Sequence, residues 1–287
     1  MGRMGLAGLG MAAAVGFAPC DANSFEIYGF IPYQAKYENN RLVKGRPSDK
    51  WFERNGLRPI KVIYDNRVLD IPRNKSKKDQ SSINDAKLKK IASTHRIGMD
   101  NMVSLDLETW NRFNDETPSR IIGLIRAYRE HHPEARLGLY STVPHNTYSW
   151  SESKIEDYVK LNAKYADVAK EVDYFSPSLY NYGDAQFSSW EAGAKFNIQA
   201  SREYDPNKPV LPYITPEVKQ PNGFRWLSYG EMMQRLEALQ QLGADGCIVW
   251  ASSRSRDESG APPVLNPQEG WLKAISDFNR RASNSRH

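Results

Sequence analysis

The chain alternates short apolar runs with longer amphipathic segments. The short runs are rich in Ile, Val, Leu, Tyr and Phe. Several are apolar at every position, as strands of a parallel sheet are when helices cover both faces. The predicted strands are Phe25–Ile31, Ile60–Tyr64, Met102–Leu107, Arg136–Tyr140, Tyr174–Tyr180, Val210–Ile214 and Gly246–Trp250.

The longer segments lie between these strands and predict helices. Thr117 followed by Pro118 is typical of a helix start, with an N-cap residue and a proline in the first turn. Gly243 is typical of the position just after a helix end. The predicted helices are Ser82–His95, Pro118–His131, Ser153–Glu171, Ser188–Arg202, Tyr229–Leu242 and Pro267–Arg281.

Strands that alternate with helices predict an α/β fold in which helical crossovers join parallel strands. Seven strands, or eight if the pattern hides one, fit a single-domain (β/α) TIM-like barrel over residues 23–287. A doubly wound open sheet is the alternative. That fold commonly carries a glycine-rich phosphate loop after its first strand, and residues 29–33 do not resemble one. The pattern therefore favours the barrel.

The first 22 residues differ from the rest of the chain. Arg3 is followed by an uncharged apolar run that reaches Ala18, with small residues beyond it. This order is typical of a secretory signal peptide, and the run is short for a membrane span. Residues 17–20 also resemble a bacterial lipoprotein cleavage box, with Pro19 as an atypical member. We predict an exported protein, secreted or periplasmic, with a lipid anchor at Cys20 or a N-terminal tail without a targeting role as the alternatives.

Composition and charge narrow the classes of partner. A chain that is 40% hydrophobic and 25% charged is an ordinary globular protein. The net charge of +5 favours anionic partners by long-range attraction. No arginine-rich tract or nucleic-acid motif is present, so nucleic acid is not a predicted partner. Five His lack ligand spacing and Cys247 lies in an apolar run, so we predict neither a metal site nor a cofactor.

Polar and aromatic residues occupy the C-terminal ends of the predicted strands, where the active site of a (β/α) barrel forms. Asp106 and Glu108 are two residues apart, a spacing that puts both side chains on one face of a strand. Carboxylates ringed by Tyr and Trp are typical of a sugar-binding site, because carboxyls perform the chemistry and rings stack on sugar faces. The candidate ring residues are Tyr33, Trp110, Tyr140, Tyr180, Tyr213 and Trp250.

Each candidate also has a structural interpretation. Asp106 could cap the following helix, and Glu108 could pair with Arg112 four residues on. Tyr140 and Tyr180 could be core tyrosines, and Trp250 could fill the core. The occurrence of such residues at several strand ends favours the functional interpretation.

Six segments, which follow one another along the chain in the same order as in a known family, carry a resemblance to that family. The second one reads Asp106-Leu-Glu-Thr-Trp110, an Asp-x-Glu followed by Trp at a strand end. The others are Ile63–Pro72, Leu137–Pro144, Phe175–Tyr180, Pro209–Tyr213 and Gly243–Trp250. With these segments the chain resembles a distant bacterial relative of the hyaluronidase family of glycoside hydrolases, over roughly residues 25–280.

The resemblance implies cleavage of N-acetylhexosaminide bonds with retention, using the acetamido group of the substrate. Glu108 would donate a proton to the leaving oxygen, and Asp106 would hydrogen-bond the acetamido N–H. Tyr140 and Tyr180 would position the acetamido carbonyl, and Trp250 would line the pocket. Burial and a like-charged neighbour are expected to raise the pKa of Glu108 and keep it protonated.

Three departures from the family concern the substrate. Leu107 replaces a Trp, residues 111–113 replace an Arg-Pro, and the disulfide-forming cysteines are absent. The prediction is therefore an extracellular or envelope polysaccharide with N-acetylhexosamine, and hyaluronan itself is not assumed. The alternatives are a glycosidase of another mechanism, with Glu217 or Asp184 as nucleophile or base, and a non-catalytic carbohydrate-binding envelope protein.

Overall fold

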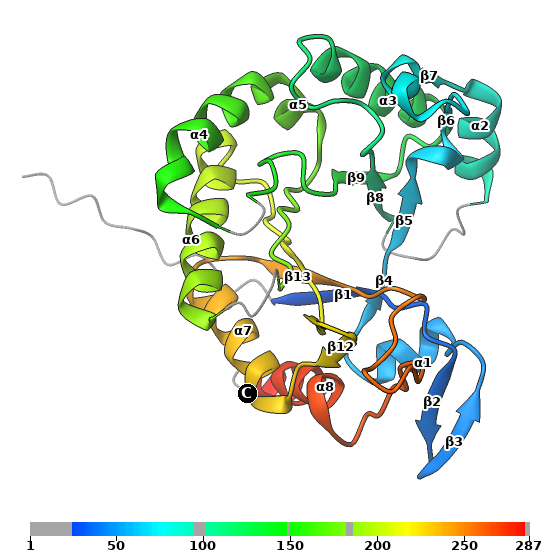
Figure 1. Ribbon diagram of the computed structural model, residues 1–287, viewed down its shortest axis with the longest axis vertical. Helices are drawn as coiled ribbons and strands as arrows, with labels where there is room; N and C mark the ends of the chain where they lie inside the picture. Colours follow the sequence, from blue (N-terminus) through cyan, green and yellow to red (C-terminus); the bar gives the residue numbers. More distant parts are fainter. Residues whose placement is uncertain (1–24, 95–100, 148–149, 182–185, 285–287) are drawn as a thin grey trace, which may run out of the picture.

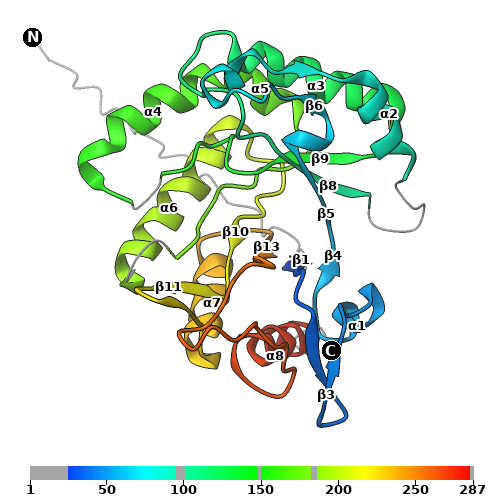
Figure 2. The same cartoon turned by 45° about the vertical axis from the view of Figure 1, so that its right-hand side comes forward.

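The computed structural model describes residues 25–94, 101–147, 150–181 and 186–284, with parallel strands inside a surround of helices (Figures 1 and 2). The predicted leader, including Cys20, and the alternative base Asp184 lie outside the described residues. The α/β class with parallel strands is confirmed.

The parallel strands form two sheets. The first has the order β10-β13-β1-β4 and the second the order β5-β8-β9, and every pair in both is parallel. The predicted strand positions are therefore correct for six of the seven runs. The strands are β1 (Glu26–Phe30), β4 (Arg58–Pro59), β5 (Lys61–Tyr64), β8 (Met102–Asp106), β9 (Arg136–Leu139), β10 (Tyr213–Ile214) and β13 (Gly246–Trp250).

The segment 174–180 joins the two sheets through isolated bridges rather than a continuous ladder. Tyr140 pairs with Ser176 on one side, and Ser178 pairs with Tyr213 on the other. Pro177 lies in this segment and has no N–H to donate, which explains why a regular ladder does not form there. The described pairings therefore do not form the single closed sheet of seven to eight strands that the sequence predicts.

Three short antiparallel pairs in the described residues were not predicted from the sequence. They lie on connections between the parallel strands, where the alternation of apolar and polar residues is too short to be recognised in the sequence. The pairs are β2 (Ala35–Glu38) with β3 (Arg41–Lys44), β6 (Leu69–Asp70) with β7 (Ser82–Ile83), and β11 (Glu217–Gln220) with β12 (Gly223–Trp226).

The helices largely follow the predicted segments, with two differences. Helix α1 is new, and the predicted Ser153–Glu171 helix is divided at Tyr165, whose ring is fully buried. Within the described parts of the chain, no helix combines the length and apolarity that crossing a membrane requires. The helices are α1 (Asp49–Arg54), α2 (Asp85–Ser93), α3 (Thr117–His131), α4 (Ile155–Lys164), α5 (Ala166–Glu171), α6 (Phe187–Tyr204), α7 (Tyr229–Gln241) and α8 (Gly270–Asn284), with short 3-10 turns η1 (Asp65–Arg67), η2 (Lys75–Gln80) and η3 (Glu152–Lys154).

Side chains fill the space that the parallel strands enclose. Successive strand residues point to opposite sides, so one set packs against the helices and the other meets inside. Gly138 lies on the inner side, where a Cβ would come within 2.3 Å of the Tyr174 ring. The packed interior therefore leaves no room for a ligand between these side chains. The inner cluster consists of Tyr28, Ile60, Met102, Tyr174, Leu211, Tyr213 and Ile248.

Candidate active site

Asp106 and Glu108 lie at the carboxyl end of β8. Asp106 is the last residue of the strand and is in register with Tyr64 of β5. Leu107 turns into the hydrophobic core at 8% exposure, and Glu108 is exposed to solvent. The burial expected for Glu108 is therefore wrong. The apolar Leu107 takes the buried position and leaves Glu108 open to an incoming ligand.

Asp106 is the less exposed acid of the pair. Burial, the charge of Glu108 and the charge of Asp65 together raise the pKa of Asp106 to about 7. Its Oδ1 atom is buried and has no hydrogen-bond partner among the described residues. An unpaired buried carboxyl oxygen is costly and commonly marks a place where a ligand supplies the missing donor.

Three hydrogen bonds anchor the loop that carries Glu108. The Thr109 hydroxyl donates to the Asp65 carboxylate. The indole N–H of Trp110 donates to the carbonyl oxygen of Ser81 at 3.0 Å, and the backbone N–H of Asn111 donates to Asp79 at 2.7 Å. All three acceptors lie between the ends of β5 and β7, so this segment determines where Glu108 stands.

Tyr140, Tyr180 and Trp250, three of the predicted ring residues, form a continuous row of rings. The ring centroids are 5.7 Å apart for Tyr140 and Tyr180 and 5.6 Å apart for Tyr180 and Trp250, both nearly stacked. All three side chains are half-buried. The indole N–H of Trp250 donates to the Tyr64 hydroxyl at 3.2 Å, which links the row to the residue in register with Asp106.

Tyr213 lies beneath this row. Its ring packs edge-on against Tyr140 at 5.0 Å, and only 1% of the residue is exposed. Burial raises the pKa of its hydroxyl well above the ordinary value. The structure places Tyr213 in the floor of the site rather than on its open surface.

Tyr33 and Trp110 are placed away from the open surface. Tyr33 is 2% exposed, and its hydroxyl donates to Glu217 at 2.6 Å and accepts from the indole N–H of Trp226 at 3.0 Å. Trp110 is 5% exposed and anchors the Glu108 loop. Both side chains support the structure around the site, which differs from the ligand contact predicted for them.

The carboxylate of Glu217, the predicted alternative nucleophile or base, accepts hydrogen bonds from other groups of the protein. It is 6% exposed, and one carboxylate oxygen accepts from both the Tyr33 hydroxyl and the backbone N–H of Ser252. These contacts join the start of β11 to the segments after β1 and β13. A carboxylate held in this way is not open to a sugar ring.

Tyr64 and Asp65 are two neighbours of Asp106 that the prediction of site residues missed. Tyr64 ends β5, and Asp65 begins the 3-10 turn η1 that follows it. The same rule that selected Asp106, a polar residue at a predicted strand end, would also have selected both. Among the described residues, no group of three or more His, Cys, Asp or Glu is arranged to hold a metal ion.

No protein-family model matches the chain, and no curated protein matches it by sequence. Among solved structures, bee venom hyaluronidase is 14% identical with a TM-score of 0.56, covering 91% of this chain and 97% of that one. The bee enzyme in complex with a hyaluronic acid tetramer is also 14% identical, with a TM-score of 0.53, covering 91% and 96% of the two chains.

A bacterial structure extends the comparison. The spore cortex-lytic enzyme SleL of Bacillus megaterium is 9% identical with a TM-score of 0.50, covering 90% of this chain and 75% of that one. Structural likeness at sequence identities this low establishes the fold alone and does not establish the chemistry. The distant resemblance to hyaluronidase that the sequence motifs indicate is thus confirmed for the fold: the chain has the fold of bee venom hyaluronidase over nine-tenths of its length.

Proposed function

We propose that this protein is a retaining glycoside hydrolase that cleaves a polysaccharide at N-acetylhexosaminide bonds, with the substrate acetamido group as nucleophile. The observation that carries the proposal is the unpartnered, buried Oδ1 of Asp106 beside the exposed Glu108. One oxygen is arranged to accept an N–H, and the neighbouring acid is open to a glycosidic oxygen. The likeness in fold to bee venom hyaluronidase supports this assignment.

The proposed first step breaks the glycosidic bond. The acetamido carbonyl oxygen attacks the anomeric carbon while Glu108 gives its proton to the leaving oxygen, and a cyclic oxazolinium forms. Water then attacks the same carbon and loses a proton to Glu108, which reopens the ring with the original configuration. A carbonyl nucleophile supplied by the substrate explains why no second carboxylate at nucleophile distance is required.

Asp106 would bind the acetamido N–H and hold the carbonyl oxygen toward the anomeric carbon. Positive charge develops on the acetamido group in the transition state, and the ionised Asp106 would be the nearest group to stabilise it. Because burial and two neighbouring acids disfavour that anion in the free protein, its interaction with a new positive charge is strengthened selectively in the transition state.

The row of rings would form the sugar-binding surface. Tyr140 and Tyr180 would orient the acetamido carbonyl, and Trp250 would stack on the apolar face of the sugar. The contact between Trp250 and Tyr64 fixes the indole plane next to Asp106. We extend the proposal to a (β/α) barrel in which the segment 174–180 completes the ring of strands, and to export by a leader over residues 1–22.

The test is reducing-end release from a panel of polysaccharides with and without N-acetylhexosamine. Glu108→Gln should lower the rate by about 10³-fold or more, because the proton donor is lost. Asp106→Asn should lower it by about 10²-fold or more. Glu130→Gln, an exposed glutamate on α3, is the matched control and should retain full activity.

Product stereochemistry tests the mechanism separately. Retention of the anomeric configuration and inhibition by a thiazoline mimic of the oxazolinium are the expected results. An inverted product would overturn acetamido participation. Full activity of Glu108→Gln would overturn the assignment of the acid.

A further inference from the structure

A pocket lies along helix α4 and against the connections that follow β8 and β9. It has a volume of about 740 Å³. We call it the α4 pocket, and its main lining residues are Arg112, Phe113, Lys154, Tyr158, Lys160 and Lys164. Arg112 is the residue that the sequence offered as an ion-pair partner of Glu108, and the sequence assigned no binding role to any of the six.

The α4 pocket shares its loops with the catalytic residues. Phe113 lies on the connection from β8 to α3, which also carries Glu108. Asn146 and Thr147, which also line the pocket, lie on the connection that follows β9 and Tyr140. Both connections leave the carboxyl ends of parallel strands, so the pocket and the catalytic pair belong to the same end of the sheet.

Positive charge dominates the lining. The ammonium groups of Lys154 and Lys160 have no hydrogen-bond or ion-pair partner among the described residues. Lys164 is already bound to Asp115 at 2.8 Å and to the carbonyl oxygen of Phe113. Asp157 is the only carboxylate among the described lining residues. The ammonium groups of Lys154 and Lys160 are therefore available to bind a ligand in the pocket.

Aromatic surface accompanies the charge. Phe113 is 70% exposed, an unusual state for a phenylalanine. The Tyr158 ring is held in place because its hydroxyl donates to the carbonyl oxygen of Thr147 at 2.9 Å and its ring stacks on Trp150 at 5.8 Å. An exposed ring next to a fixed ring and free ammonium groups is suited to a sugar that carries an acidic group, since one face of a sugar is apolar and the carboxylate is not.

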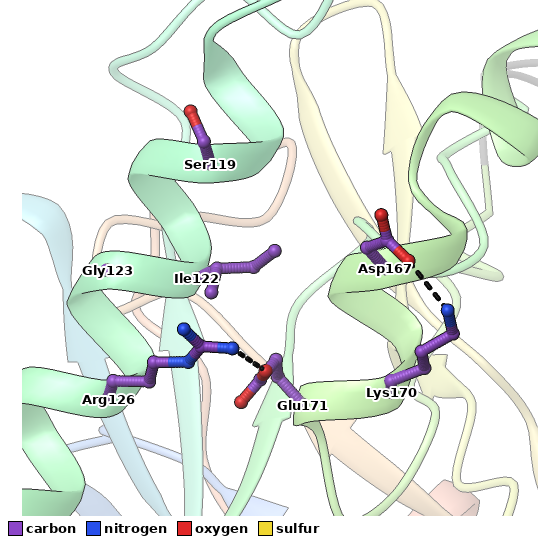
Figure 3. A pocket seen from close by; sticks show the side chains of 7 residues that line it. All are labelled: Ser119, Ile122, Gly123, Arg126, Asp167, Lys170 and Glu171. Carbon is purple, nitrogen blue, oxygen red and sulfur yellow. Dashed lines mark hydrogen bonds and ion pairs between the residues drawn. The ribbon is translucent and has the colours of Figure 1, made fainter.

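A groove between α3 and α5 shows that charged residues alone do not make such a pocket. Arg126 pairs with Glu171 at 2.7 Å, and Lys170 pairs with Asp167 at 2.7 Å (Figure 3). These charges neutralise one another, and no aromatic residue is among the described residues that line the groove. The α4 pocket differs in both respects.

We propose that the α4 pocket is an accessory subsite for an acidic sugar residue of the polysaccharide chain whose bond is cleaved at Asp106 and Glu108. The inference rests on the proposed function and adds the acidic character of the polymer. It also predicts that long acidic chains bind better than short neutral ones, because they reach both sites at once.

Binding to the inactive Glu108→Gln protein tests the inference without requiring catalysis. The probe is tetragalacturonate, with neutral chitotetraose as comparison, measured by isothermal titration calorimetry. The Glu108→Gln protein should bind tetragalacturonate. Adding Lys154→Ala with Lys160→Ala should weaken this binding at least about fivefold, and adding Phe113→Ala should weaken it to a similar extent. Chitotetraose affinity should change less than about twofold in both cases.

The matched control removes the same charge elsewhere. Lys50→Ala with Lys89→Ala, on exposed faces of α1 and α2, should leave tetragalacturonate binding within about twofold. The inference is overturned if this control weakens binding as much as the α4 substitutions do, since net charge alone would then explain it. It is also overturned if tetraglutamate binds as tightly as tetragalacturonate, or if the α4 substitutions have no effect.

The outcomes separate this inference from the proposed function. If tetragalacturonate binding depends on Lys154 and Lys160 but the wild-type protein releases no reducing ends from any polysaccharide, the subsite is supported and the hydrolase is rejected. If the wild-type protein cleaves a neutral polymer and the two lysines have no effect on binding, the hydrolase is supported and the subsite is rejected.

Discussion

Asp106 makes the folded protein bind a proton more tightly than the unfolded chain does. Its pKa is about 7 in the fold and 3.8 as the ordinary value. Between these two pH values the folded state holds the extra proton, so the free energy of unfolding falls as pH rises. Above pH 7 the full cost of the buried anion remains. In the proposed mechanism, function and stability therefore oppose each other at this single residue.

Asp106→Asn should relieve that cost. Asparagine resembles the protonated acid, so the variant should be more stable than the wild type at pH 8, by about 1–3 kcal/mol. The difference should vanish near pH 4. Urea unfolding at both pH values measures it, with Asp49→Asn, at an exposed position of α1, as control. Equal pH dependence in the wild type and the variant would contradict a raised pKa at Asp106.

The position of the proposed catalytic pair at a strand end, and of Tyr140, Tyr180 and Trp250 near it, could be predicted because strand ends are visible in the sequence. The direction in which each side chain points cannot be predicted from the strand pattern. Tyr33 is hydrogen-bonded to Glu217, which is 184 positions away in the chain, and no local pattern reports such a contact. Tyr213 and Trp110 are buried for the same kind of reason, because tertiary packing decides on which side of the sheet a strand-end ring is covered.

At the scale of elements, the ends of β5 and β8 act as one unit. Tyr64 is in register with Asp106, Asp65 raises the pKa of Asp106, and Thr109 on the Glu108 loop donates to Asp65. Asp65 therefore has two effects that can be separated. Its charge acts on Asp106, and its hydrogen bond acts on the position of Glu108.

Asp65→Asn should remove the charge while keeping an oxygen for the Thr109 hydroxyl. The pKa of Asp106 should fall, and because ionised Asp106 is the active form in the proposed mechanism, the acidic limb of the pH–kcat profile should move down by roughly half to one pH unit.

Thr109→Val is the complementary change. It keeps the Asp65 charge and loses the hydrogen bond, so kcat should fall about three- to tenfold with the acidic limb unmoved. The two variants are compared by pH–rate profiles. A limb that shifts equally in both would show that Asp65 does not act through its charge.

Gly138 controls the packing inside the strands. Gly138→Ala would put a methyl group against the Tyr174 ring, and we expect a loss of about 1–3 kcal/mol in the free energy of unfolding. Gly230→Ala in α7 meets no atom within 4 Å and should be neutral or slightly stabilising. Chemical denaturation compares them. A tolerated Gly138→Ala would mean that the inner cluster is less closely packed than described.

The pattern of apolar runs predicted most strands and helices because period and length are properties of a single segment. It missed the strand interruption at 174–180 and the division of the long helix at Tyr165. Both depend on particular residues acting against the surrounding pattern: Pro177 removes a ladder donor, and the Tyr165 ring is drawn into the core against His145 at 4.0 Å.

At the scale of the whole molecule, the first described residues already belong to the core and to β1. Phe25 is buried at 6% exposure, and β1 starts at Glu26. Cleavage after residue 22 would therefore leave every described strand complete. Intact-mass measurement of the protein from an exporting host should find an N-terminus near residue 23.

A mass that corresponds to a lipidated Cys20 would instead establish an anchored form. Cys20→Ser would then release the protein from the membrane fraction without loss of folding. An uncleaved chain in the cytoplasm would contradict export.

Trp250 also makes the site observable. Its indole N–H is bound to Tyr64, and one ring face is stacked with Tyr180. A sugar that settles on this row would displace water from an indole whose orientation is already fixed. Intrinsic fluorescence should therefore change on ligand binding without an added label, and the difference between wild type and Trp250→Phe isolates that signal from the other six tryptophans.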